Sequence, residues 1–292
     1  MSSAEEIRNK GFHLFRPYEE YFDEPIEVEG VRSPNWAIKL MRVTIRPLAH
    51  LLFRLEVRGR ENIPPAGEEP VVFVANHVSY VDPIVMWVST TRRVMRFMAR
   101  SSLWRIPLLR GLISRVGAIP VDPDSADRKA VKRASGALKR GECVAIFAEG
   151  TRMRSLEKTY KPHGGFVLIA QMSKVKIVPV GITGADRVAA PTRKVKLPRL
   201  PKITITYGEA FSLDEFSEYP KTERTQAIVE ETMRRVFALR DSADPSPIRP
   251  GLPPFGVVEE HDRKALLGDL APCSGPNPAA RVDTVADAQV SE

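Results

Sequence analysis

Short apolar runs that are rich in β-branched residues alternate with helical patterns along the middle of the chain, and this alternation limits the folds open to it. The runs lie near residues 71–75, 94–99, 117–121, 143–147 and 175–182. Strands that alternate with helices form a sheet covered by those helices. The sequence therefore predicts an α/β fold with a mixed, mostly parallel sheet flanked by helices.

Two later segments extend this pattern. Residues 203–207 alternate apolar and Thr side chains without a long preceding helix, which favours an added antiparallel strand. Residues 223–240 carry apolar side chains at helical spacing and are expected to close the domain. A chain of 292 residues with 43% hydrophobic content can bury a large core. We expect one α/β domain over residues 56–240, with additions over residues 1–55 and 241–292.

Residues 36–55 are mostly apolar but carry basic side chains every three or four positions, which places those side chains on one helical face. The basic residues are Lys39, Arg42, Arg46, His50 and Arg54. The charges argue against a membrane-spanning helix and favour an amphipathic helix in a membrane interface, kinked or divided at Pro47. The side chains expected to face lipid are Trp36, Ile38, Leu48, Leu51, Leu52 and Phe53. A helix packed on the α/β domain explains the pattern equally well.

Charge is distributed unevenly along the chain. Residues 241–292 hold four Lys and Arg against nine Asp and Glu, a net charge of −5, so the whole chain's +8 leaves +13 for residues 1–240. The acidic segment is rich in proline and is expected to be disordered. The basic part suits an anionic membrane, phosphorylated substrates or nucleic acid. Because the chain has no recognisable nucleic-acid-binding motif, no nucleic-acid partner is expected.

The first residues contain neither a basic nor an apolar segment of the secretory type, so we expect a protein on the cytoplasmic side of a membrane. The two cysteines suit a reducing compartment. Cys143 lies in a predicted strand and Cys273 in the acidic segment, and neither is expected to act as a nucleophile. The cysteines and the five histidines lack the spacings of metal sites, so no metal is expected.

A histidine and an aspartate follow the apolar run at 71–75. His77 and Asp82 are five positions apart, which would separate their directions by about 140° within one helix, so a turn must lie between them. Ser79 is expected to cap a following helix, with Asp82 as its capping partner and His77 in the turn. Asp82 could then hold the Nδ1 proton and leave Nε2 as a base. The alternative is an ordinary turn histidine beside a helix-capping aspartate.

A second polar cluster follows the run at 143–147. Glu149 could bind a substrate hydroxyl, Gly150 allows close backbone approach, and Arg152 can bind phosphate with two hydrogen bonds. The alternative is a surface turn with an ion pair between Glu149 and Arg152.

Together these segments resemble the glycerol-phosphate acyltransferase family, which includes the lysophosphatidic acid acyltransferases. Four blocks similar to the family's motifs stand in the expected order, at residues 76–82, 117–122, 147–153 and 178–180. The first has the form N-H-x-x-x-x-D. The resemblance covers roughly residues 55–212, and four ordered blocks are far more specific than one motif.

The resemblance implies that His77 is the general base and Asp82 its partner. It also implies a set of acceptor-binding residues, namely Asn76, Glu149, Gly150, Thr151 and Arg152, with Lys161 as a weaker candidate. Lys161 could equally be a solvated loop lysine. Pro123 stands where the second motif usually has a phosphate-binding Arg, so that contact is missing or comes from elsewhere, with Arg128 one candidate.

The activity implied is O-acyl transfer from coenzyme A or acyl carrier protein to a glycerol-phosphate-type hydroxyl, with 1-acylglycerol 3-phosphate the preferred acceptor and no other cofactor. The implied product is phosphatidic acid, made by a peripheral or monotopic protein at an anionic membrane surface. Glycerol 3-phosphate, or another lysolipid or glycolipid, stays open as the acceptor. A catalytically silent lipid-binding protein would use the same pocket and the same basic helix.

Overall fold

The computed structural model describes residues 22–23, 26–28, 31–32, 41–90, 93–122, 127–150, 162–188 and 202–243. The strands are β1 (Glu27–Val28), β2 (Val31–Arg32), β3 (Glu56–Arg58), β4 (Val71–Ala75), β5 (Met95–Arg100), β6 (Ile119–Val121), β7 (Cys143–Phe147), β8 (Lys176–Thr183) and β9 (Thr204–Tyr207). The α-helices are α3 (Arg46–Phe53), α4 (Asp82–Ser89), α5 (Pro107–Arg115), α6 (Arg128–Lys139), α7 (Gly165–Ser173) and α8 (Lys221–Ala243). Shorter helical segments are η2 (Met41–Ile45), η3 (Arg60–Asn62), η4 (Ser101–Arg105), η5 (Ala185–Arg187) and η6 (Leu213–Phe216).

The main sheet has seven strands in the order β3-β9-β8-β4-β7-β5-β6. The strands from β8 to β6 are parallel to one another, β9 is antiparallel to β8, and β3 pairs in parallel with β9. This confirms the predicted mixed, mostly parallel sheet and the predicted antiparallel strand. The runs expected at 71–75 and 143–147 coincide with β4 and β7, and the other three match β5, β6 and β8 to within one or two residues. The predicted closing helix lies inside α8.

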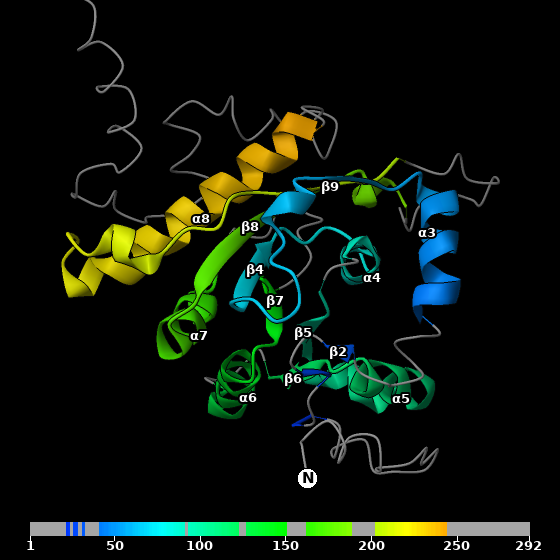
Figure 1. The fold of residues 1–292 in the computed structure, drawn as a ribbon, viewed down its shortest axis with the longest axis horizontal. Helices are drawn as coiled ribbons and strands as arrows, with labels where there is room; N and C mark the ends of the chain where they lie inside the picture. The colour runs from blue at the N-terminus through cyan, green and yellow to red at the C-terminus, as the bar shows by residue number, and fades with distance from the viewer. Residues whose placement is uncertain are drawn as a thin grey trace, which may run out of the picture.

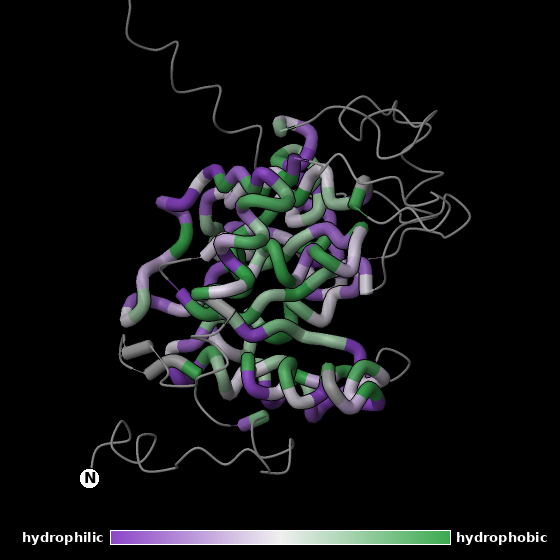
Figure 2. Tube along the Cα trace, turned by 90° about the vertical axis from the view of Figure 1, so that its right-hand side faces the viewer, coloured by the Kyte–Doolittle hydropathy of each residue, from purple (hydrophilic) through white to green (hydrophobic). Residues whose placement is uncertain are grey.

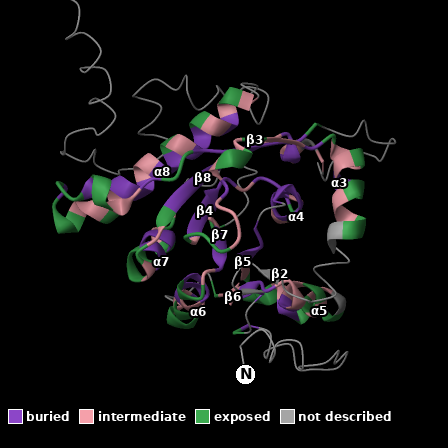
Figure 3. Ribbon diagram, viewed as in Figure 1, coloured by how far each residue is buried: buried purple, intermediate pink, exposed green. Residues whose placement is uncertain are grey.

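Helices cover both faces of the sheet, as Figure 1 shows with α6, α7 and α8 on one side and α3 and α4 on the other. Successive side chains of β4 point to opposite faces. Val72 and Val74 pack in the core beneath α6, α7 and α8, whereas Phe73 and Ala75 pack in the core that includes α4. All five residues of β4 are buried, and the strands form the buried centre in Figure 3. The hydropathy along the tube in Figure 2 shows the same apolar interior.

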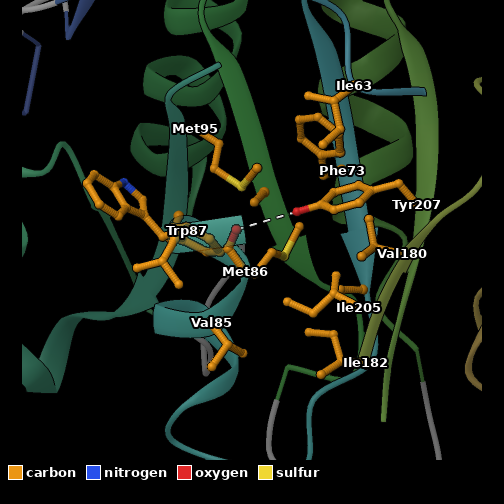
Figure 4. Close-up of a cluster of buried hydrophobic side chains, with 14 of the residues drawn as sticks. Ile63, Phe73, Val85, Met86, Trp87, Met95, Val180, Ile182, Ile205 and Tyr207 are labelled. Atoms are coloured by element: carbon orange, nitrogen blue, oxygen red, sulfur yellow. Dashed lines mark hydrogen bonds between the residues drawn. The ribbon is translucent and has the colours of Figure 1, made fainter. Parts of the chain in front are cut away.

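Helix α4 is held against the sheet by a buried tyrosine. The hydroxyl of Tyr207, on β9, lies 2.6 Å from Oγ of Ser89 and 3.4 Å from the carbonyl oxygen of Met86. Figure 4 shows this hydroxyl reaching the last turns of α4 from among apolar side chains. Helix α4 begins with the predicted site residue Asp82. The bonds from Tyr207 to the other end of the helix therefore help to fix its orientation, and with it the position of Asp82.

The amino-terminal helical segment is described from Met41 onward, so the part expected at residues 36–40 lies outside the described residues. The segment changes from η2 to α3 at Arg46, next to Pro47, in agreement with a division there. Ile45, Ala49 and Phe53 lie one turn apart and pack against the core. The prediction that Phe53 faces lipid is therefore wrong, because it shares the inward face with Ala49.

The outward face of the same segment is apolar. Val43, Leu48 and Leu51 are exposed, with 74%, 50% and 73% of their surfaces accessible. The segment therefore combines the two alternatives that the sequence left open, since one face packs on the domain and no described element covers the other. Among the described residues, no helix is both long and apolar enough to cross a membrane.

A buried ion pair joins the sheet to Phe22 and Ile26, near the amino terminus. Arg96, on β5, donates to both carboxylate oxygens of Glu142, before β7, at 3.1 and 3.3 Å, and neither side chain is exposed. Arg96 also donates to the carbonyl oxygen of Phe22 at 3.0 Å, and the amide of Ile26 donates to Glu142. These contacts attach residues near 22–26 to the edge of the sheet at which β5 and β7 begin.

Replacement of Glu142 by Ala should lower the free energy of unfolding by about 3–5 kcal/mol, because Arg96 would stay buried without its counter-charge. Urea unfolding measures the difference. The control is Glu56→Ala, which breaks an exposed ion pair with Arg58 and should change stability little. Equal effects of the two substitutions would contradict a buried pair.

Candidate active site

The predicted site residues meet at one edge of the sheet because β4 and β7 are parallel neighbours. Ala75 and Phe147, the last residues of these strands, are paired in register. His77 and Glu149 each lie two residues beyond, and the amide of His77 donates to Oε2 of Glu149 at 2.7 Å. The two sequence motifs, 72 positions apart, are therefore in direct contact.

Asp82 binds both the turn and the imidazole with a single oxygen. Its Oδ2 accepts from Nδ1 of His77 at 2.8 Å and from the amides of Val78 and Ser79 at 2.7 Å each. The carboxylate is fully buried, whereas 17% of the His77 side chain is exposed. Because an ionised carboxylate only accepts hydrogen bonds, the shared proton belongs to Nδ1. The geometry thus leaves Nε2 of the neutral ring as a proton acceptor.

The turn differs from the prediction in one respect. Helix α4 begins at Asp82 with Val81 in the N-cap position, and no side chain caps it, so the prediction of Ser79 as the N-cap is wrong. The hydroxyl of Ser79 accepts only a long hydrogen bond, 3.5 Å, from the amide of Val81. Asp82 reaches back to the turn amides instead, and so it both closes the turn and holds His77.

Phe147 contributes a contact that sequence reasoning missed. Its ring stacks on the His77 ring at a centroid distance of 4.3 Å and an interplanar angle of 25°. Phe147 in turn stacks on Phe97 of β5, with centroids 6.1 Å apart. One face of the imidazole is therefore covered, which restricts ring rotation. The register between β4 and β7 produces this contact, and no local pattern reveals it.

Asn76 is 1% exposed, and its amide pairs with the backbone of β8. Nδ2 donates to the carbonyl oxygen of Ile182 at 2.9 Å, and Oδ1 accepts from the amide of Ile182 at 2.7 Å. The side chain thus substitutes for a strand residue and ties the turn to β8. A contact between Asn76 and substrate stays a prediction.

Glu149 is nearly buried, and burial raises the pKa of its carboxyl to about 8. The hydrogen bond from the His77 amide lowers the pKa, the charge of Asp82 raises it, and the positive charge of Arg240 lowers it. At neutral pH most of the carboxyl is protonated. It can then donate a hydrogen bond to an oxygen of a bound molecule as well as accept one.

Gly150 has a left-handed backbone, with φ of +61°, and the ring of His163 lies directly over it. A Cβ atom at this position would lie 2.6 Å from Cδ2 and 2.7 Å from Nε2 of His163. The amide of His163 donates to the carbonyl oxygen of Ala148 at 2.8 Å. The chain therefore returns to the end of β7 at His163, a contact that the sequence analysis did not anticipate.

The other predicted residues are not all brought to this point. Thr151, Arg152, Lys161 and Pro123 lie outside the described residues. Arg128 begins α6 after β6, and the strand order places β5 and β7 between β6 and β4. At roughly 4.8 Å per strand, β6, the strand that precedes α6, lies on the order of 14 Å from β4. The structure does not place Arg128 beside His77.

No group of three or more His, Cys, Asp or Glu side chains that could hold a metal ion is found in the described part of the chain.

Replacement of Gly150 by Ala should destabilise the fold in two ways, through the left-handed backbone and through displacement of the His163 ring. The matched control is Gly141→Ala, since Gly141 has φ of +86° with nothing near its Cβ position. In urea unfolding, we expect Gly141→Ala to lower the free energy of unfolding by about 1–2 kcal/mol and Gly150→Ala to lower it by more. The excess should disappear in a His163→Ala background, and an excess that persists there would contradict the contact.

The raised pKa of Glu149 predicts a pH-dependent stability. The folded state binds this proton more tightly than the unfolded chain, whose carboxyl titrates near its ordinary value of 4.5. The contribution of Glu149 is therefore fully present below pH 4.5 and is lost as the pH rises through about 8. Glu149→Gln should gain stability relative to wild type across this window in urea unfolding at several pH values. A pH-independent difference would contradict the raised pKa.

Comparisons with known proteins agree with this arrangement. Residues 54–183 match the family model named Acyltransferase. The chloroplastic 1-acyl-sn-glycerol-3-phosphate acyltransferase LPAT1 of Arabidopsis thaliana is 27% identical over 178 residues, 60% of this chain and 45% of that protein. The 1-acyl-sn-glycerol-3-phosphate acyltransferase of Streptococcus pneumoniae is 32% identical over 121 residues, 41% of this chain and 44% of that protein. These matches span less than half the length of each relative.

A solved structure shares the fold. The 1-acyl-sn-glycerophosphate acyltransferase PlsC from Thermotoga maritima aligns with a TM-score of 0.54 at 23% identity, covering 78% of this chain and 85% of that one. The segment that matches the family model includes His77, Asp82 and Glu149. Residues 54–183 therefore resemble the Acyltransferase family, and the chain shares the fold of PlsC.

Proposed function

We propose that this protein transfers a fatty acyl group from an acyl thioester to the hydroxyl of a glycerol-phosphate-type acceptor, with 1-acylglycerol 3-phosphate as the acceptor and phosphatidic acid as the product. The observation that carries the proposal is the 2.8 Å bond between His77 and Asp82 at the carboxyl end of the central strand. The names of the curated relatives support this choice of acceptor.

The reaction follows from the free Nε2 of His77. The acceptor hydroxyl gives its proton to Nε2 as its oxygen attacks the carbonyl carbon of the thioester. The tetrahedral intermediate then collapses, the C–S bond breaks, and the proton passes from Nε2 to the departing sulfur. Asp82 stays ionised and stabilises the transient imidazolium. The chemistry needs no covalent acyl-enzyme, and Cys143 is buried within β7.

Glu149 suits the binding of an anionic acceptor because its carboxyl is mostly uncharged at neutral pH. A second carboxylate beside the buried Asp82 would repel a phosphate monoester, whereas a protonated carboxyl can hydrogen-bond to the acceptor's oxygens. Thr151, Arg152 and Lys161 complete the proposed acceptor site on the strength of the sequence resemblance alone.

The proposed acyl donor is acyl-coenzyme A or acyl-acyl carrier protein, with no further cofactor. Both the preferred acceptor and the product are lipids, which places the reaction at a membrane surface, and we propose peripheral attachment on the cytoplasmic side. The exposed side chains of Val43, Leu48 and Leu51 form an apolar face suited to the lipid interface. The net charge of +13 in residues 1–240 favours an anionic surface.

Acyl transfer tests the function directly. Wild-type protein in vesicles should convert a mass-resolved acyl-coenzyme A and 1-acylglycerol 3-phosphate to phosphatidic acid, and His77→Ala should lower kcat by roughly 10²–10⁴-fold, the usual contribution of a general base.

The control for this assay is Lys176→Ala, an exposed residue at the start of β8 and therefore at the opposite edge of the sheet. Its activity should match that of wild type. Equal turnover by wild type and His77→Ala would reject His77 as the base. The protein would be a lipid-binding protein instead if it bound lipid but transferred no acyl group, from either acyl-coenzyme A or acyl-acyl carrier protein, to any of the candidate acceptors.

The membrane proposal is tested by replacing Leu48 and Leu51 together with Glu and floating the protein with phosphatidylglycerol vesicles. Loss of two apolar side chains from the interface should reduce vesicle binding by roughly tenfold or more. Leu168→Glu on α7 is the matched control, since Leu168 is also an exposed leucine, at 47%. Equal binding by the two variants would show that this face does not meet lipid.

A further inference from the structure

His163 lies at the end of β7, against Gly150, but has no part in the mechanism above. Its ring covers Gly150, and Gly150 follows Glu149, whose carboxyl accepts the amide hydrogen of His77. A continuous set of contacts therefore leads from His77 to His163 along the end of β7. The His163 residue is exposed.

The position of His163 is fixed from two sides. Its amide donates to the carbonyl oxygen of Ala148 at 2.8 Å. The edge of its ring that carries Cδ2 and Nε2 lies over Gly150, two residues after Ala148. Only a residue without a Cβ atom permits this approach. The side chain is thus seated at the strand end, unlike an ordinary surface histidine that extends into solvent.

The chemistry of the ring complements that of Glu149. An imidazole N–H donates a hydrogen bond to a phosphate oxygen, and in its protonated form the ring also supplies a positive charge. Helix α7 begins at Gly165, two residues later, and the amino-terminal end of a helix favours a nearby anion.

The sequence resemblance leaves one phosphate contact unassigned. The second motif has Pro123 in place of the family's usual phosphate-binding Arg, and Arg128 lies two intervening strands away from β4. In the described part of the chain, the basic ring of His163 lies over Gly150, the residue next to Glu149.

We propose that His163 binds the phosphate monoester of the acceptor beside Gly150 and sets the enzyme's preference for a phosphorylated acceptor. The inference rests on the proposed function and adds to it a residue outside the recognised motif blocks. His163 contacts the acceptor rather than the reacting atoms, so its loss weakens acceptor binding and leaves the chemical step at His77 intact.

The test measures KM for 1-acylglycerol 3-phosphate, KM for the acyl donor and kcat in wild type, His163→Ala, His163→Lys and His163→Glu. His163→Ala should raise the acceptor KM by roughly ten- to a hundredfold, as expected for a lost hydrogen bond to a charged group, with donor KM and kcat nearly unchanged. His163→Lys should restore the acceptor KM to near the wild-type value, because a lysine ammonium also donates a hydrogen bond to phosphate. His163→Glu should raise it further. Lys176→Ala again serves as the unaffected control.

The outcomes separate the two proposals. The role of His163 would be overturned if His163→Ala left the acceptor KM unchanged. It would also be overturned if His163→Ala raised the acceptor KM and the donor KM alike and His163→Lys did not restore them. In either case, turnover by the wild-type protein would still uphold the proposed function. Wild-type protein that acylates no glycerol-phosphate acceptor would overturn the proposed function and this inference together. Should His163→Ala fail to fold in a thermal unfolding control, the difference between the Lys and Glu variants decides the matter.

Discussion

The site depends on one buried oxygen atom, Oδ2 of Asp82, which accepts three hydrogen bonds from donors that lie within five residues of it in the sequence. A buried carboxylate is costly unless it is paired, and here two turn amides and the imidazole supply the compensation. The same three bonds determine the path of the chain after β4, the start of α4 and the tautomer of His77. Loss of this carboxylate would therefore disturb the turn and the base together.

The sheet supplies what this local cluster lacks. The pairing of Ala75 with Phe147 brings Glu149 under the amide of His77 and stacks Phe147 on the imidazole, while Asn76 ties the turn to β8. The first two contacts come from β7 and the third from β8, which are the two neighbours of β4. The imidazole is held before any substrate binds, and such preorganisation is a principal source of catalytic power in enzymes.

Much of this arrangement could be predicted from the sequence because it is local or periodic. The buried strands β4 and β7 appear as continuous apolar runs, and the contact of His77 with Asp82 follows from the need for a turn between them. Contacts between distant segments could not be predicted, such as the stacking on Phe147, set by sheet register, and the closure of His163 over Gly150, set by the return of the chain before α7. The expected Ser79 cap was wrong because α4 begins three residues later, at Asp82, although Asp82 does accept from the Ser79 amide as a capping partner would. Phe53 was misplaced because amphipathic spacing does not say which apolar face meets the core.

The most direct test of the central claim is the tautomer of the His77 ring, observed by two-bond ¹H–¹⁵N correlation NMR on protein labelled with ¹⁵N-histidine. His77→Ala assigns the His77 signals among those of the five histidines. The account predicts that the neutral ring carries its proton on Nδ1, bound to Asp82, and that Asp82→Asn disturbs this preference. A neutral wild-type ring protonated on Nε2 would contradict the account, because that nitrogen could not then take a proton from an acceptor hydroxyl.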